Sequence, residues 1–115
     1  MGYTNIGNAL EIVDSGNVVY VMPGLYTENI DFKGKKFTLY CTGEAGSCIL
    51  DGNGEGPVVT FSGGEDSTTV LDGFTITGGS SYQDGGGMVV DSDPLIQNCI
   101  FTGNSTTDFG GAITF

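Results

Sequence analysis

An internal repeat of about 25 residues constrains this chain more than any other feature of its sequence. A shift by one repeat lays segment 71–78 on 96–103 and segment 85–88 on 110–113, with apolar residues on apolar residues and glycines on glycines. A period in the twenties, built from short β runs and turns, is typical of a β solenoid in which each repeat forms one coil. The repeat therefore predicts an all-β fold, a right-handed parallel β-helix of about four coils.

Other solenoids fit the pattern less well. Leucine-rich repeats share the period, but their scaffold of leucines and asparagines is missing here. A left-handed hexapeptide helix would have a period of about 18 residues, and no such period is present. In a parallel β-helix, inward side chains stack on their equivalents one coil away. The stacked pairs that we expect are Leu71 with Ile96, Ile76 with Phe101, and Met88 with Ile113.

The first residues follow a different period. Ile6, Ala9, Leu10 and Val13 recur at the spacing of one helical face. The pattern predicts a helix over residues 4–14, begun by a cap at Thr4 or Asn5 and ended near Gly16. We expect this helix to close one end of the stack. Further β runs are bounded by Gly, Asn or Asp, at 18–21 (stopped by Pro23-Gly24), 37–40, 48–50, 58–61 and 70–71.

These elements fit a single domain over residues 1–115, with β coils from residue 17 onward and the repeat clearest at 71–115. The sequence stops within an expected strand at 112–115. We expect the chain to be the N-terminal part of a longer solenoid. The alternative is that the last coil pairs with another molecule.

Charge excludes several classes of partner. Fourteen acidic residues face three lysines, and the net charge is −11. Such a chain is poorly suited to nucleic acid or anionic lipid, which need neutralising cations. No run of apolar residues is long enough for a membrane-spanning helix, so no membrane insertion is expected. Neither arginine nor histidine occurs, which excludes a histidine-based triad.

The positions of the three cysteines predict a different role for the first two than for the third. Cys41 and Cys48 bracket a glycine-containing loop, so they are a disulfide candidate in an oxidising compartment, with the reduced pair as the alternative. Their spacing is not that of a zinc site. Cys99 lies within an expected strand and is predicted to be a small buried apolar residue.

Two stretches resemble known families. Residues 17–30 (NVVYVMPGLYTENI) resemble the opening segment of pectin-lyase-like right-handed β-helix proteins. Phe101 and Asn104, followed by Gly110-Gly111-Ala112-Ile113, resemble the FxxN and GGA[ILV] motifs of polymorphic outer-membrane-protein repeats. The resemblance implies an extracellular or cell-surface location. The expected roles of Phe101, Asn104, Gly110 and Gly111 are structural.

The same resemblance argues against catalysis in this segment. Lyases of the superfamily use arginine or lysine as base, and polygalacturonases need histidine and arginine; the sequence lacks both arginine and histidine. Weak calcium candidates are Asp72 and Asp91 at expected turns, although the nonapeptide calcium repeat is missing and no other cofactor is implied. The candidate binding residues are Tyr82 in an expected exposed loop, Asp91 and Asp93. Most of the tyrosines are expected in the core or the cap, and Asn104-Ser105-Thr106 is a glycosylation sequon.

Three functions remain open. The first is a non-catalytic structural or adhesive module of a secreted or cell-surface protein, with a surface glycan or protein as partner. The second is an N-terminal fragment of a polysaccharide-degrading β-helix enzyme. The third is a subunit that forms dimers or filaments through its last coil.

Overall fold

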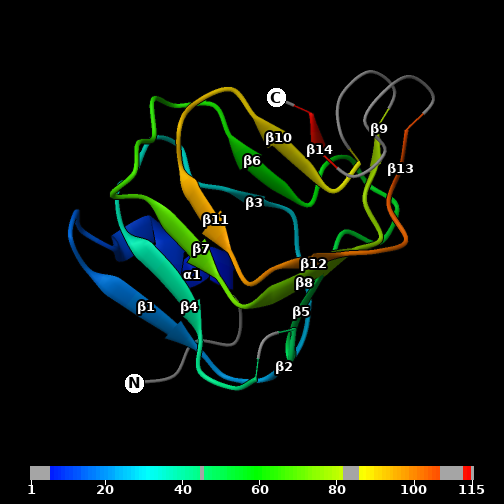
Figure 1. The fold of residues 1–115 in the computed structure, drawn as a ribbon, viewed down its shortest axis with the longest axis horizontal. Coiled ribbons are helices and arrows are strands. Elements are labelled where there is room, and N and C mark those ends of the chain that lie inside the picture. Colours follow the sequence, from blue (N-terminus) through cyan, green and yellow to red (C-terminus); the bar gives the residue numbers. More distant parts are fainter. Residues whose placement is uncertain (1–5, 45, 82–85, 107–112, 115) are drawn as a thin grey trace.

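The computed structural model describes residues 6–44, 46–81, 86–106, 113 and 114. Within them the chain forms one helix, α1 (Ile6–Ile12), and fourteen short strands (Figure 1). The strands are β1 (Val18–Val21), β2 (Gly24–Thr27), β3 (Ile30–Asp31), β4 (Thr38–Cys41), β5 (Cys48–Asp51), β6 (Val59–Phe61), β7 (Val70–Asp72), β8 (Phe74–Thr77), β9 (Ser80–Ser81), β10 (Met88–Val90), β11 (Leu95–Gln97), β12 (Ile100–Phe101), β13 (Ser105–Thr106) and β14 (Ile113–Thr114).

The strands return in a fixed order to three parallel sheets, which surround a common interior (Figure 1). Sheet A has the order β1-β4-β7-β11, sheet B the order β2-β5-β8-β12 and sheet C the order β3-β6-β10-β14. We call one passage through sheets A, B and C a circuit, and the described residues make four of them. The short pair β9–β13 forms between sheets B and C of the last two circuits. The fold is therefore built mainly from parallel strands with one short helix, as the repeat predicts.

The register explains why the repeat is visible only in the second half of the sequence. Circuits 3 and 4 pair at one constant offset, which is the same in β7–β11, β8–β12, β9–β13 and β10–β14. In sheet A, Val18 pairs with Thr38 and Thr38 pairs with Val70, so the second offset is much longer than the first. The earlier circuits differ in loop length, so their period drifts although the strands still pair.

Alternation along the strands separates the core from the surface. In β4, Leu39 and Cys41 are buried, while Thr38 and Tyr40 between them point outward. Aromatic rings fill the middle of the stack: Phe32 lies 4.9 Å from Phe37 and 4.4 Å from Phe61, measured between ring centroids. Each of these rings belongs to a residue that is at most 1% exposed.

The predicted stacked pairs are aligned in the backbone register. Leu71 pairs with Ile96, Ile76 with Phe101, and Met88 with Ile113. Leu71, Ile76 and Met88 are fully buried, whereas Ile96 and Phe101 in the last circuit are half-buried. This difference follows from position, because the fourth circuit has a neighbour on one side only among the described residues.

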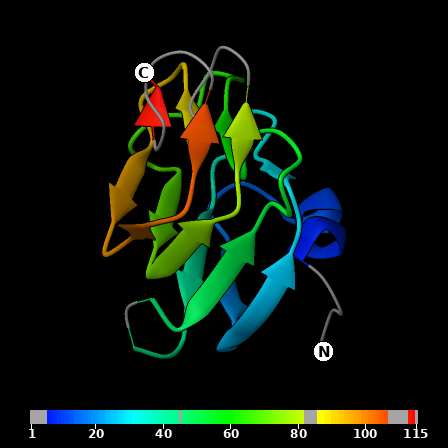
Figure 2. The same ribbon diagram turned by 90° about the vertical axis from the view of Figure 1, so that its right-hand side faces the viewer.

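Helix α1 ends at Ile12, two residues before the end of the predicted span 4–14, and its first described amides have a partner that the sequence pattern missed. The expected caps, Thr4 and Asn5, lie outside the described residues. Among the described residues, the carboxylate of Glu28, directly after β2, accepts the backbone N–H groups of Ile6 and Gly7, both at 2.8 Å. A carboxylate satisfies free amides at a helix N-terminus and suits its positive dipole end. Ile6 and Leu10 join the core, and Figure 2 shows the helix at the end of the stack where circuit 1 lies.

The β run over 18–21 ends before Pro23-Gly24, as predicted, but the sequence did not predict the new strand that follows at once. Strand β2 begins at Gly24, whose N–H donates to the carbonyl of Ser47 at 3.2 Å. Pro23-Gly24 turns the chain from sheet A into sheet B and pairing resumes at once. A Pro-Gly pair marks a change of direction, and in a stack of circuits each bend is followed by another strand.

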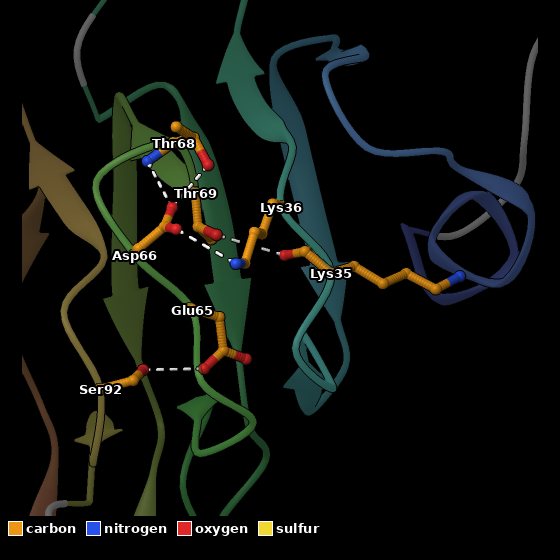
Figure 3. A network of polar contacts seen from close by, with 7 residues as sticks. All are labelled: Lys35, Lys36, Glu65, Asp66, Thr68, Thr69 and Ser92. Atoms are coloured by element: carbon orange, nitrogen blue, oxygen red, sulfur yellow. Dashed lines mark hydrogen bonds and ion pairs between the residues drawn. The ribbon is translucent and has the colours of Figure 1, made fainter.

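A buried carboxylate holds one corner of the stack (Figure 3). Glu65 is 2% exposed and accepts the N–H of Gly34 at 2.8 Å, the N–H of Gly63 at 2.9 Å and the hydroxyl of Ser92 at 2.7 Å. Burial pushes the pKa of Glu65 upward, but these hydrogen bonds, the one from Ser92 first, outweigh it and the pKa is lowered. One side chain thus joins the corner loops that follow circuits 1, 2 and 3.

The loops meet backbone to backbone at this corner. A Cβ added to Gly63 would clash with the backbone nitrogen of Gly34, so no larger residue fits without displacing a loop. Beside it, Asp66 accepts the hydroxyl and N–H of Thr68 and pairs with Lys36 at 3.1 Å. The Thr68 hydroxyl, then its N–H and Lys36, lower the pKa of Asp66 to about 2.

We predict that Glu65→Gln removes part of the acid sensitivity of the fold. The native pKa of Glu65 lies below its ordinary value of 4.5, so the unfolded state takes up the proton first. Its contribution is complete above about pH 4.5 and is lost as pH falls through the native pKa. At pH 7 the substitution should cost about 2 kcal/mol, since charged hydrogen bonds are lost. Urea unfolding at pH 7 and at steps down to pH 3 measures both effects.

The matched control is Glu44→Gln on an exposed loop, which should leave the unfolding free energy unchanged. Equal pH dependence in the wild type and in Glu65→Gln would contradict the role assigned to this carboxylate.

Candidate functional site

The outer face of sheet A is the most distinctive surface of the molecule. Side chains at equivalent positions of β1, β4, β7 and β11 form two rows that run across the strands. We call these the apolar row (Val18, Thr38, Val70 and Leu95) and the tyrosine row (Tyr20, Tyr40, Asp72 and Gln97). Parallel strands lie about 4.8 Å apart, so each row presents one side chain per circuit at that spacing.

Two exposed aromatic rings begin the tyrosine row. Tyr20 is 67% exposed and Tyr40 is 38% exposed. Their ring centroids are 6.0 Å apart and their planes are nearly perpendicular, at 84°. The sequence predicts most tyrosines in the core or the cap, but these two face solvent, because alternation in β1 and β4 turns the residues on either side of each of them inward. Edge-to-face rings stabilise each other, so the pair holds its geometry while it faces solvent.

A carboxylate held by two amides continues the row. The Oδ2 atom of Asp72 accepts a hydrogen bond from Nε2 of Gln97 at 2.9 Å, and Oδ1 accepts one from Nδ2 of Asn98 at 3.0 Å. Asn98 adopts a left-handed conformation with φ 56°, which brings its side chain back over the preceding circuit. An ionised carboxylate has about four lone-pair sites, so Asp72 keeps acceptor capacity after these two bonds.

Asp72 therefore differs from the turn residue that the sequence predicted. Its two carboxylate oxygens accept side-chain amides from circuit 4. Asp51, which like Asp72 precedes a glycine, does accept a backbone amide, from Asn53 at 2.8 Å. The two sites look alike in sequence, but only at Asp72 does the next circuit supply Gln97 and Asn98 as donors.

The other predicted binding residues are Tyr82, Asp91 and Asp93. Tyr82 lies outside the described residues. Asp91 and Asp93 are exposed in the bend between β10 and β11, where their backbone N–H groups donate to the carbonyls of Phe61 and Glu65. Among the described residues, no three acidic or cysteine side chains are grouped closely enough to hold a metal ion. Neither of the calcium candidates, Asp72 and Asp91, therefore belongs to such a group.

The structure describes two of the four repeat-motif residues, Phe101 and Asn104. Gly110 and Gly111 lie outside the described residues. Phe101 is in β12, and Asn104 bridges two circuits: its Oδ1 accepts the N–H of Gly79 at 3.0 Å and its Nδ2 donates to the carbonyl of Ile76 at 2.9 Å. A glycan on Asn104 would have to be attached at this same Nδ2 atom, on a half-buried residue.

The structure joins Cys41 and Cys48 by a disulfide, with a Cα–Cα distance of 5.9 Å. The bond closes the loop between sheets A and B of circuit 2. Cys99 is a free thiol and is half-buried rather than fully buried. Burial raises the pKa of Cys99, so the thiol stays protonated and is a poor nucleophile at neutral pH.

A groove of about 690 Å³ lies between α1 and β3. Three of its polar side chains already have structural roles: Glu28 caps the helix, Asn29 donates to the carbonyl of Pro57, and the ammonium of Lys35 donates to the carbonyl of Leu10. We therefore regard the outer face of sheet A, rather than this groove, as the candidate site.

Comparisons with protein-family models, curated proteins and solved structures find no match for this chain. Within the described part of the chain, no helix is long and apolar enough to cross a membrane. The function must therefore be argued from the geometry of the site.

We predict that reduction of the Cys41–Cys48 bond lowers the free energy of unfolding by about 2–3 kcal/mol, because the unfolded chain regains the freedom of a short loop. Urea unfolding with and without a phosphine reductant measures the difference. A Cys99→Ser variant controls for effects at the free thiol. Unchanged stability after verified reduction would show that this bond does not constrain the fold.

Proposed function

We propose that this chain is a right-handed parallel β-helix module of a secreted or cell-surface protein, without catalytic activity of its own. It binds a surface glycan through the outer face of sheet A. The observation that carries the proposal is the exposed Tyr20–Tyr40 pair, which lies in line with the amide-held carboxylate of Asp72.

The β-helix assignment is supported by the repeated order of the three sheets and by the constant offset between the paired strands of the last two circuits. An extracellular location is supported by the Cys41–Cys48 disulfide, because such bonds persist in oxidising compartments. The strongly acidic composition, with a net charge of −11, suits a soluble surface module.

Glycan contact follows from the chemistry of the face. Aromatic rings offer an apolar surface to the C–H groups of a sugar, while carboxylate and amide groups bind its hydroxyls. Both kinds of group lie on adjacent strands of one sheet, which holds them in fixed relative positions. A rigid scaffold of this kind lowers the entropic cost of binding, because the contacting side chains are already held in place.

We predict that binding to a glycan array depends on the tyrosine pair. The double substitution Tyr20→Ala and Tyr40→Ala should abolish the array signal of the wild-type chain, because it removes the stacking surface. Leu25→Ala is the matched control: Leu25 is 64% exposed, close to Tyr20 at 67%, and lies on sheet B instead. Wild-type binding that survives the double substitution, or no binding to any glycan, would refute the proposed role of this face.

Self-association through the last circuit is a second candidate function. Ile96 and Phe101 are half-buried where their partners one circuit earlier, Leu71 and Ile76, are fully buried. Strands β11 and β12 also form the edge of sheets A and B. An edge strand with apolar side chains is a template for pairing with another chain.

We predict that a self-associating chain would show a mass that rises from micromolar to millimolar concentration in sedimentation equilibrium. Ile96→Lys would reduce that rise, since it places a charge at the edge. A monomer at all concentrations would eliminate this second function and leave the glycan proposal intact.

A further inference from the structure

The geometry points to a specific ligand class: an uncharged, extended polysaccharide that lies across the strands of sheet A along the tyrosine row. This inference rests on the glycan-binding function proposed above and specifies its ligand. Three features of the surface favour this ligand: the spacing of the row, the different side chains at its two ends, and the negative charge around it.

The row has the repeat of an extended sugar chain. Tyr20, Tyr40, Asp72 and Gln97 occupy equivalent positions on four successive strands. Strands pair about 4.8 Å apart, which is close to the length of one sugar in a chain linked through equatorial bonds. A tetrasaccharide segment laid along the row therefore places one sugar unit over each circuit.

The two ends of the row offer different contacts. Tyr20 is the more exposed of the two and supplies the stacking platform, while Tyr40, whose ring is nearly perpendicular to it, adds a phenolic hydroxyl. At the other end, Asp72 accepts hydrogen bonds from sugar hydroxyls. Hydrogen bonds to an ionised carboxylate are short and roughly twice as strong as neutral ones. The amides of Gln97 and Asn98 fix the carboxylate in place for this contact.

Charge selects against acidic sugars. The row contains a carboxylate and no cation, and all three lysines of the chain lie within residues 33–36. Lys36 is paired with Asp66, and the ammonium of Lys35 donates to the carbonyl of Leu10. A polyuronate laid on this face would meet Asp72 and the net charge of −11 without compensation. The preference for neutral over acidic sugars should weaken at high salt, because salt screens the repulsion between the carboxylates.

The test is isothermal titration calorimetry of the 115-residue chain with three β-1,4-linked hexasaccharides at low salt: cellohexaose, mannohexaose and hexamannuronate, the last of which differs from mannohexaose only in its carboxylates. We expect binding of at least one neutral hexasaccharide, and binding of the uronate that is weaker by about tenfold or more. Tyr20→Ala and Asp72→Asn should each weaken neutral binding about tenfold. Tyr20→Trp should restore it, because the stacking surface is kept, and Leu25→Ala should match the wild type. Thermal unfolding of each variant verifies that the fold is intact.

The outcomes separate this inference from the proposed function. Binding of the uronate as strong as that of the neutral sugars, still dependent on Tyr20, overturns the ligand class and leaves glycan binding by this face standing. If neither neutral hexasaccharide binds but another glycan on the array gives a signal that depends on Tyr20, the ligand class is again overturned and glycan binding by this face still stands. If the neutral hexasaccharides bind the Tyr20→Ala and Asp72→Asn variants as tightly as they bind the wild type, the proposed site is wrong.

Discussion

Parallel pairing between successive circuits is the interaction on which the rest of this structure depends. Each strand of sheets A, B and C bonds to its equivalent one circuit away, so the backbone hydrogen bonds of one circuit are satisfied by the next. The pairing also stacks like positions, which aligns Leu39 with Leu71 and Phe61 with Val90. Core and surface are therefore set by the same register.

That register leaves the corners to be satisfied in another way. Where the chain turns between sheets, polar groups lose their strand partners and must find others. Glu65 satisfies two loop amides and the Ser92 hydroxyl at one corner, Glu28 satisfies the first amides of α1, and Asn104 bridges Gly79 and Ile76. No buried side-chain nitrogen or oxygen is left without a hydrogen bond among the described residues. Side chains at the bends thus supply the hydrogen bonds that strand pairing supplies within the sheets.

The same register builds the candidate site. An outward residue on one strand is repeated by outward residues on its neighbours, so a functional row needs no cleft and no special loop. Tyr20, Tyr40 and Asp72 are separated by unequal stretches of sequence, yet they lie on adjacent strands. The uneven circuit length that hides the repeat in the first half of the chain also hides this row.

The sequence by itself determined the parallel strands, the helix near the N-terminus, the stacked pairs of the last two circuits and the cysteine pair that the structure joins. These follow from local patterns: a fixed offset, helical spacing and a loop of suitable length. Only the tertiary structure decided which tyrosines face solvent, that Glu28 accepts the first described amides of α1, and that Asp72 bonds to Gln97 and Asn98. Each of these depends on which residues of another circuit lie alongside. Because circuits 1 to 3 differ in length, that alignment cannot be read from spacing in the sequence.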